Sequence, residues 1–335
     1  MTAVEPVGLV LSLAVAAILL VVVVVLVWWI DRYDREPWPI VLLVFLWGMI
    51  VAPGLVILVG GLIQGIEFGF GFNFPIAVGV APLIEELAKG AGILLVVVFS
   101  QHFDNPTDGL VYGTAVGLGF AVTENLLYGL WSAPELGQGQ AMAVVFGRTL
   151  FTAGVHALAS SLVGAGLGFG RTSGRRLSAV GWAVMGLVAA VVLHGGWNAA
   201  VVNLPSEAGW LFPTMILGPM YLIFGGSFGL MLWGEHRILV RQLSEEVELG
   251  VVPDWAAGVI PYYRRRVRSD WWPSRPERIV ISRLLTRLAF RKHALAARGD
   301  SANIEGLEIV RLRATIQGIL GKTEAAELPD DLSDS

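Results

Sequence analysis

The sequence predicts an all-α membrane protein: a polytopic helix bundle of about seven spans, followed by a mostly helical cytoplasmic C-terminal appendix. Of its 335 residues 55% are hydrophobic and 15% charged, with mean hydropathy +0.68, whereas soluble domains carry about 25% charged residues. This composition excludes a water-soluble enzyme. The chain has no cysteine, which excludes disulfides, thiolate nucleophiles and Cys-ligated zinc.

Seven apolar runs reach the roughly 20 residues that a helix needs to cross a bilayer. The first has no Lys or Arg before it and is longer than the apolar core of a secretory signal, so it is expected to be a retained span. The runs are 7–30, 38–63, 74–99, 109–131, 141–169, 177–202 and 210–233.

Basic residues alternate between the connections. Arg32 and Arg35 follow the first run and Arg171, Arg175 and Arg176 the fifth, while 16 Lys and Arg lie beyond residue 233. Because Lys and Arg favour cytoplasmic loops, the N-terminus is expected outside and the C-terminus in the cytoplasm of a multi-pass cell-membrane protein.

The composition changes at residue 234, which predicts a membrane bundle over 1–233 and a cytoplasmic appendix over 234–335 that ends in a disordered acidic tail. Residues 264–298 hold 11 Lys and Arg against two acidic residues, and such a cluster attracts anionic lipid. The helical pattern there fits either a membrane-surface helix or the first half of a helical hairpin. Nucleic acid is the weakest alternative, because RRRVR has no companion motif.

Ionisable side chains inside the runs are informative because a charge at mid-bilayer costs roughly 3 kcal/mol. By their distance from each run's midpoint, Glu85, Glu124, His156 and His194 fall within a slab roughly 8 Å thick. They can therefore meet if their helices face one another. Arg148 is expected to extend to the outer interface instead.

Three pairs at i, i+4 spacing are expected to support these groups: an ion pair in one case and a hydrogen bond to an imidazole in the other two. The pairs are Glu85 with Lys89, His156 with Ser160, and His194 with Asn198.

Two chemistries fit these residue types. Two imidazoles and a carboxylate form a zinc-type ligand set with an open position for water, and a further glutamate acts as general base. Alternatively, a buried glutamate activates water without metal and the histidines stabilise the oxyanion. Residue spacing does not separate the two.

Four motifs, each on its own predicted helix, resemble in their order those of the PrsW family of intramembrane proteases. They are EExxK at Glu85, Glu86 and Lys89, GFxxxEN ending at Glu124 and Asn125, a lone His156, and HxxxN at His194 and Asn198, all within residues 75–203. This family is similar to the CAAX-protease and bacteriocin-processing enzymes. The resemblance implies hydrolysis of a peptide bond in a membrane-tethered protein, such as an anti-sigma factor.

Carried over by position, the resemblance assigns Glu85 and Glu86 as the water-activating pair and His156 and His194 as metal ligands or oxyanion donors. Glu124 would be a third acidic member and, with the two histidines, the tentative metal set for Zn²⁺. Supporting roles fall to Lys89, Asn125, Ser160 and Asn198.

A carboxylate and histidine based proton- or ion-coupled transporter is the alternative function. Transporters commonly contain internal repeats, and none is found in this sequence. The basic appendix is not part of the family pattern, so the resemblance assigns it no role.

Overall fold

A computed structural model of the chain describes residues 7–33, 35–70, 76–100, 102–173, 175–203, 211–268, 271–272, 274–298 and 303–327. These residues are helical nearly throughout and contain no β-strand, which confirms the predicted all-α class. Of the acidic end that was predicted to be disordered, residues 327–335, Glu327 is helical and residues 328–335 lie outside the described residues.

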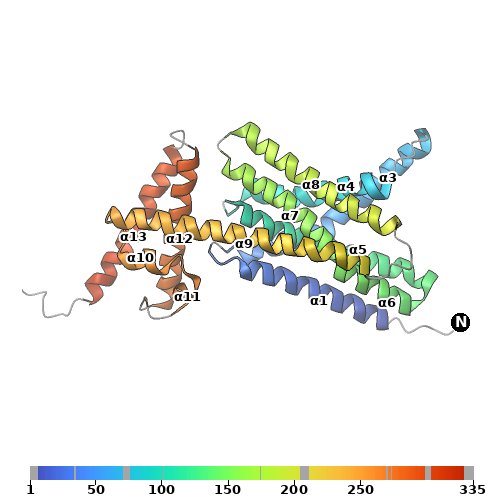
Figure 1. The fold of residues 1–335 in the computed structure, drawn as a ribbon, viewed down its shortest axis with the longest axis horizontal. Helices are drawn as coiled ribbons and strands as arrows, with labels where there is room; N and C mark the ends of the chain where they lie inside the picture. The colour runs from blue at the N-terminus through green and yellow to red at the C-terminus, as the bar shows by residue number, and fades with distance from the viewer. Residues whose placement is uncertain are drawn as a thin grey trace, which may run out of the picture. The chain divides into compact units, whose positions relative to one another are not determined.

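The helices follow one another along the chain (Figure 1). Among the described residues, three π-helical segments, η1 to η3, continue directly into α-helices. In chain order the elements are α1 (Val7–Ile30), α2 (Trp38–Leu46), η1 (Trp47–Val51), α3 (Ala52–Phe70), η2 (Ile76–Val80), α4 (Ala81–Phe99), α5 (Pro106–Leu136), α6 (Gln138–Gly147), η3 (Arg148–Thr152), α7 (Ala153–Thr172), α8 (Arg176–Asn203), α9 (Leu211–Glu248), α10 (Asp254–Val259), α11 (Tyr263–Arg266), α12 (Arg275–Arg298) and α13 (Asn303–Glu327).

Within the described part of the chain, six helical segments are long and apolar enough, by length and composition, to cross a membrane. They correspond to six of the seven predicted runs. The remaining run, 74–99, contains η2 and the 19-residue helix α4, which carries Glu85, Glu86 and Lys89. The chain is therefore a multi-pass helix bundle in which one helix is both apolar and rich in ionisable side chains.

The chain divides into two compact units. The first contains Met1–Asp31 and Glu36–Phe228, and the second contains Arg32–Arg35 and Gly229–Ser335. Helix α9 begins in the first unit and ends in the second. All of the predicted site residues belong to the first unit.

A row of glycines on α5 lets this helix pack directly against the backbone of α7. A Cβ atom built on these glycines would lie 2.1 to 2.4 Å from a carbonyl oxygen of α7, well inside van der Waals contact, so only glycine permits this approach. The glycines and the residues that they face are Gly109 with Gly164, Gly113 with Ser160, and Gly117 with His156. Two of the facing residues are predicted site residues.

Local signals set the ends of α5. The Asn105 side chain accepts hydrogen bonds from the backbone N–H groups of Thr107 and Asp108, and the Asp108 carboxylate accepts one from the Asn105 N–H at 2.9 Å. This is a capping box, with Pro106 in the first turn. The helix ends at Gly137, whose φ of 81° suits glycine.

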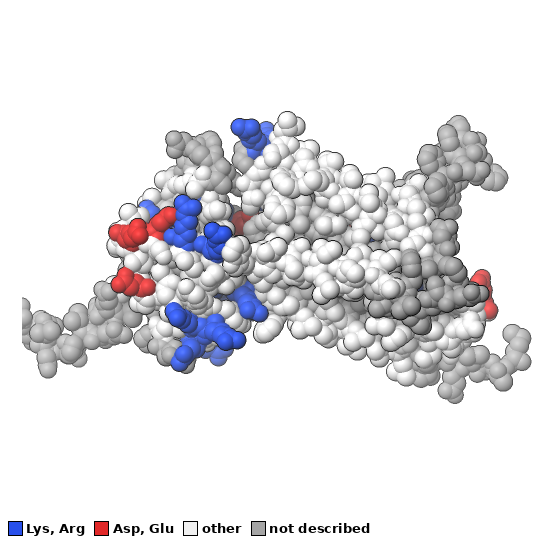
Figure 2. Space-filling model, viewed as in Figure 1, with Lys and Arg blue, Asp and Glu red and all other residues white. Residues whose placement is uncertain are grey.

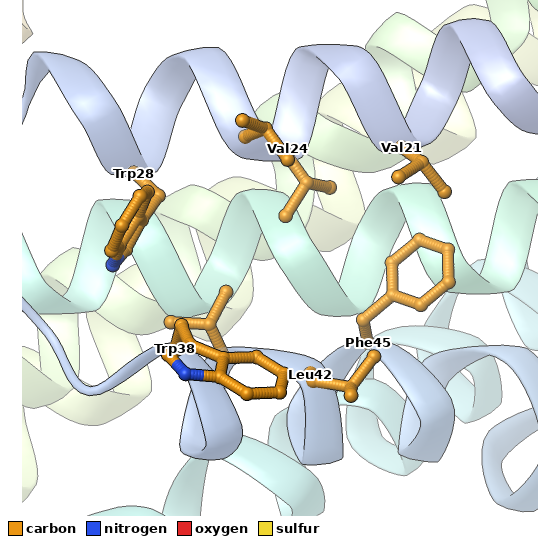
Figure 3. A pocket seen from close by; sticks show the side chains of 8 residues that line it. Val21, Val24, Trp28, Trp38, Leu42 and Phe45 are labelled. Carbon is orange, nitrogen blue, oxygen red and sulfur yellow. The ribbon is translucent and has the colours of Figure 1, made fainter.

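An apolar groove of about 280 Å³ lies between α1 and α2 in the first unit (Figure 3). Its walls are aliphatic and aromatic, and no ionisable side chain is among the residues that line it, so it provides no catalytic group. The residues labelled there are Val21, Val24, Trp28, Trp38, Leu42 and Phe45.

The second unit has its own hydrophobic core, formed by α10, α12, α13 and the end of α9. On α12, Ile281, Leu285 and Leu288 are at most 1% exposed and belong to the same cluster as Leu312 and Ile316 of α13. Of the two alternatives for this segment, the structure therefore contains the helical hairpin, and the apolar face of α12 is buried in protein.

Ion pairs reinforce this hairpin. Arg287 and Arg291 of α12 contact Glu308 of α13 at 2.5 and 3.3 Å. The buried Glu246 of α9 contacts Lys292 and Arg313, each at 2.6 Å. A single carboxylate thus connects α9 with both helices of the hairpin.

Candidate active site

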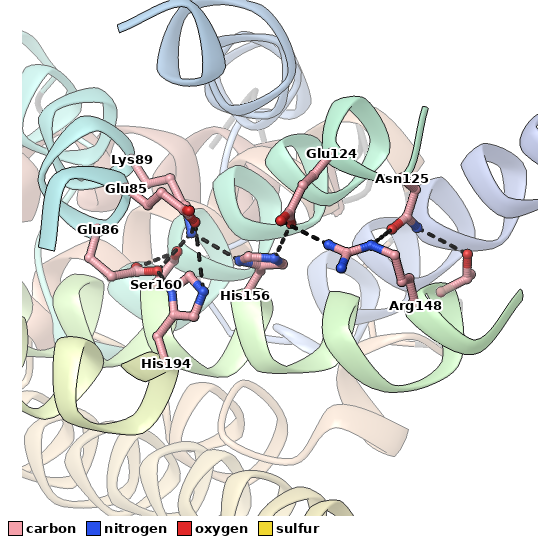
Figure 4. A network of polar contacts seen from close by, with 10 residues as sticks. Glu85, Glu86, Lys89, Glu124, Asn125, Arg148, His156, Ser160 and His194 are labelled. Atoms are coloured by element: carbon pink, nitrogen blue, oxygen red, sulfur yellow. Dashed lines mark hydrogen bonds and ion pairs between the residues drawn. The ribbon is translucent and has the colours of Figure 1, made fainter. Parts of the chain in front are cut away.

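Four helices of the first unit bring the predicted polar residues together in one network (Figure 4). The network contains Glu85, Glu86 and Lys89 of α4, Glu124 and Asn125 of α5, His156 and Ser160 of α7, and His194 of α8. The remaining predicted residue, Asn198, is partly buried on α8, four residues after His194. Side chains separated by up to about a hundred residues thus form a single cluster.

Glu86 is the centre of one half of the network. Its carboxylate is fully buried and accepts hydrogen bonds from Lys89 Nζ at 2.7 Å and from Ser160 Oγ at 3.0 Å, and it contacts His194 Nδ1 at 2.9 Å. Ser160 was expected to hydrogen-bond His156, and this expectation is wrong. The rotation of α7 turns the hydroxyl toward the glutamate on α4.

The contact with Glu86 determines which nitrogen of His194 carries the proton. A carboxylate accepts from an N–H, so Nδ1 is assigned as protonated and Nε2 keeps its lone pair. Nε2 faces Glu85, 3.6 Å from Oε2. A neutral His194 can therefore accept a proton or ligate a metal through Nε2, but it donates to an oxyanion only as an imidazolium.

Both ring nitrogens of His156 contact charged side chains. Lys89 Nζ lies 3.0 Å from Nδ1 and Glu124 Oε2 lies 2.5 Å from Nε2. Because an ammonium group can only donate, Nδ1 is the acceptor and Nε2–H donates to Glu124. The ring packs edge to face against His194, with centroids 4.7 Å apart.

Arg148 holds Glu124 from the other side. Its guanidinium lies 2.8 Å from Glu124 Oε1, donates to Asn125 Oδ1 at 3.3 Å and covers the Tyr128 ring at 3.7 Å. The expectation that Arg148 extends to the outer interface is therefore wrong. A carboxylate within reach is a better partner for a buried guanidinium than a path to water.

Glu85 differs from the other carboxylates of the network. Its Oε2 atom is buried and has no hydrogen-bond partner among the described residues. Lys89 Nζ and His194 Nε2 each lie 3.6 Å from it. The expected ion pair of Glu85 with Lys89 is present, but Lys89 lies closer to Glu86. A buried carboxylate oxygen without a hydrogen bond suits a water molecule or a cation as its missing partner.

Among the described residues, Glu85, His156 and His194 could hold a metal ion together. One ligand atom from each lies within 4.8 Å of the others. Two imidazoles and a carboxylate are typical zinc ligands, and the Glu86 contact orients His194 as metal-ligating histidines usually are. The donor set fits zinc, provided that His156 exchanges one of its contacts for the metal.

The carboxylate of this group is not the one that the sequence assigned. Glu124 was expected to complete the metal set, but its two oxygens contact Arg148 and His156. In this arrangement Glu85 Oε2 faces His194 Nε2, and Glu124 holds His156 through its Nε2 atom.

Sequence reasoning missed the role of Arg148 and the hydroxyl of Thr149, which accepts a hydrogen bond from Asn125 Nδ2 at 3.0 Å. The usable signal was the cost of an arginine inside a span, which requires a partner, and Glu124 was available on the preceding helix. Nothing comparable in the sequence pointed to the Thr149 hydroxyl.

Comparisons with known proteins agree with the geometry. Residues 36–225 match the model of a family described as "PrsW family intramembrane metalloprotease". The chain is 32% identical over 187 residues to "Protease PrsW" of Bacillus subtilis, covering 56% of this chain and 80% of the relative. It is 27% identical over 191 residues to "Protease PrsW" of Oceanobacillus iheyensis, covering 56% and 81%.

A further "Protease PrsW", from Geobacillus kaustophilus, is 34% identical over 123 residues, which are 36% of this chain and 53% of the relative. No solved structure matches the chain. The family match ends at residue 225, before Gly229, where the larger segment of the second unit begins. It contains the whole polar network and favours hydrolysis over ion-coupled transport.

Proposed function

Because the chain belongs to the PrsW family of intramembrane metalloproteases, we propose that its α4, α5, α7 and α8 network hydrolyses a peptide bond of a membrane-tethered protein, such as an anti-sigma factor. The observation that carries this proposal is the buried Oε2 of Glu85, which has no hydrogen-bond partner among the described residues and faces His194 Nε2. Water bound there would contact a carboxylate and an imidazole lone pair at once.

In the metal-free form of the proposed reaction Glu85 accepts a proton from this water, which then attacks the carbonyl carbon of the scissile bond. The proton passes to the leaving amine as the tetrahedral intermediate collapses. Glu86 orients His194 throughout, because its carboxylate is itself held by Lys89 and Ser160. Glu124 and Arg148 orient His156 in the same way.

Glu85, His156 and His194 would hold a zinc ion, which when bound acidifies water and polarises the carbonyl of the substrate. The tautomer assigned to His194 supports the metal-dependent form of the proposal, since Nε2 presents a lone pair. In the metal-free form, the same nitrogen has to be protonated before it can stabilise an oxyanion.

The site assignment is tested with Glu85→Gln, His156→Ala and His194→Ala. The test measures cleavage of a co-expressed membrane-tethered candidate substrate and the amount of each variant inserted in the membrane. We expect loss of cleavage by at least about 100-fold with normal insertion. Glu135→Gln, an exposed glutamate of α5, is the matched control. Cleavage by all three variants at the control rate would refute the assignment.

Metal dependence is tested by elemental analysis of the purified protein, with activity measured before and after chelation. Stoichiometric zinc that is lost together with activity supports the metal-dependent form. His194→Ala should then bind zinc more weakly than Glu135→Gln does. Full activity of metal-free protein would contradict this form and leave the glutamate-dependent one.

We also propose that residues 1–233 form the proteolytic bundle in the cell membrane, with the N-terminus outside and the appendix 234–335 in the cytoplasm. The distribution of Lys and Arg among the connections supports this orientation. The chain lacks cysteine, so a single introduced thiol can be labelled without background. An impermeant maleimide on intact cells should label Gln140→Cys and spare Thr172→Cys, and the opposite pattern would invert the topology.

The basic segment 264–298 is proposed to be attracted to anionic lipid, because its 11 Lys and Arg exceed its two acidic residues. Such attraction is long-ranged and requires no defined binding site. It should weaken as salt shortens the Debye length.

A further inference from the structure

The second unit contains a cleft of about 440 Å³, a volume within the about 300–1,000 Å³ typical of ligand pockets. Its walls come from two distant parts of the chain, the segment Arg32–Arg35 that follows α1 and residues 263–283. Figure 2 shows basic side chains, with some acidic ones, gathered over the second unit, whereas the visible surface of the first unit is nearly free of basic side chains.

Arginine dominates the lining of this cleft, and no acidic residue is among the described residues that line it. Six guanidinium groups take part, those of Arg32, Arg35, Arg266, Arg275, Arg278 and Arg283. Guanidinium groups that share a cleft repel one another, and an anion between them relieves this repulsion. Arginine also matches phosphate in geometry, since its planar fork donates two parallel hydrogen bonds.

Several of these arginines are held in place by contacts that leave donors unused. Arg32 lies over the Tyr263 ring, 5.1 Å from its centroid. Arg278 donates one hydrogen bond to the Arg268 carbonyl at 2.9 Å, and each guanidinium has five N–H donors. Arg275 and Arg283 make no ion pair with any residue that the structure describes. Arg275 and Arg283 therefore present guanidinium donors to the cleft that pair with no anion among the described residues.

Ser282 provides an independent observation. This residue lines the cleft and is 5% exposed, yet its hydroxyl has no hydrogen-bond partner within the described part of the chain. On a helix, a serine hydroxyl normally finds a backbone carbonyl or water. A buried, unpartnered hydroxyl among arginines is what a phosphate oxygen would satisfy.

We propose that this cleft is a binding site for a phosphate group, supplied by the headgroup of an anionic phospholipid. Its position along the chain favours a lipid source. Arg32 is only two residues beyond Ile30, where α1 ends, so its Cα lies within about 7 Å of the end of a membrane-spanning helix. Trp28 and Trp29, which suit a membrane interface, lie four and three residues before Arg32. A soluble phosphate compound would use the same donors.

A defined site makes predictions that diffuse attraction of residues 264–298 does not. Arg275→Gln with Arg283→Gln removes two guanidinium groups from the cleft. Arg264→Gln with Arg265→Gln removes the same charge from exposed positions within 264–298 that do not line it. Because diffuse attraction depends on net charge, it predicts similar losses for both pairs, whereas a defined site predicts a loss for the cleft pair alone.

The experiment uses the full chain in dodecyl maltoside micelles, with saturable binding of fluorescent phosphatidylglycerol and the thermal melting temperature as readouts. Phosphatidylcholine is the comparison lipid, and inorganic pyrophosphate is the free anion. We expect saturable binding of phosphatidylglycerol with a higher melting temperature. The cleft pair should weaken binding at least about tenfold, Ser282→Ala about three- to tenfold, and the control pair less than about twofold.

The outcomes separate the alternatives. Stabilisation by pyrophosphate but not by phosphatidylglycerol would show a phosphate site served from solution and overturn the lipid source. Equal losses of lipid binding in the cleft pair and the control pair would show that the interaction depends on net charge and not on a defined site. No saturable binding of either probe would overturn the site itself. None of these readouts depends on protease activity, so failure of the proteolytic proposal leaves them intact.

Discussion

Replacing Gly117 by alanine should inactivate the site although no polar residue is changed. Gly117 lies on α5, and an added Cβ would stand 2.3 Å from the carbonyl oxygen of His156 on α7. Ordinary van der Waals contact begins at 3.4 Å, so the two helices must separate by about 1.1 Å at this point. The neighbouring atom is backbone, which a side-chain rotation cannot move away.

This displacement acts directly on a contact of the site. The distance from His156 Nε2 to Glu124 Oε2 is 2.5 Å, and a full shift of α7 would lengthen it to about 3.6 Å, beyond a hydrogen bond. Misplacement of a catalytic group by about 1 Å can cost about 100-fold in rate. Overpacking is expected to lower the stability of the bundle by about 1–3 kcal/mol.

Gly181→Ala on α8 is the matched control, because a Cβ there has no neighbour within 4 Å and both substitutions add the same helix propensity. The measurements are cleavage of a membrane-tethered substrate and thermal melting in detergent. We expect Gly117→Ala to lose activity about 100-fold and to melt earlier, while Gly181→Ala keeps both values. Wild-type activity and melting of Gly117→Ala would refute the packing argument.

Two further predictions concern charged partners. Arg148→Gln should lower cleavage about tenfold or more, because Glu124 loses the guanidinium 2.8 Å away that fixes it; Arg148→Lys should retain more activity, and equal rates for both variants would contradict a positioning role. Glu246→Gln should destabilise the second unit by about 1–3 kcal/mol, because Arg313 and Lys292 lose their shared carboxylate. Limited proteolysis of the full chain would detect this destabilisation as faster cutting of residues 229–335 by an added protease. An unchanged rate of cutting there would argue against it.

The sequence by itself determined the class of the protein and the membership of the site. Apolar runs of spanning length have few alternatives to membrane helices, because every backbone polar group in a bilayer must be satisfied within the segment. Ionisable residues inside such runs are costly, so Glu85, His156 and His194 stood out without any structural information. The ordered motifs led to the family that the comparisons then showed.

Only the tertiary structure decided which of these groups contact one another. Spacing along a helix indicates which side chains share a face, but not how the helix is rotated or how near its neighbours lie. Lys89 therefore proved closer to Glu86 than to Glu85, and Ser160 bonds Glu86 instead of His156.

The same limit explains Arg148 and the cleft of the second unit. Arg148 and Glu124 lie on different segments, η3 and α5, and their side chains meet only through the packing of the bundle. The arginines of the cleft come from two segments, 32–35 and 266–283, that lie more than two hundred residues apart in the chain. The sequence by itself showed these segments only as two separate basic clusters. Partners that meet through tertiary packing have no fixed separation along the chain, which is why residue spacing identified the site residues but not their contacts.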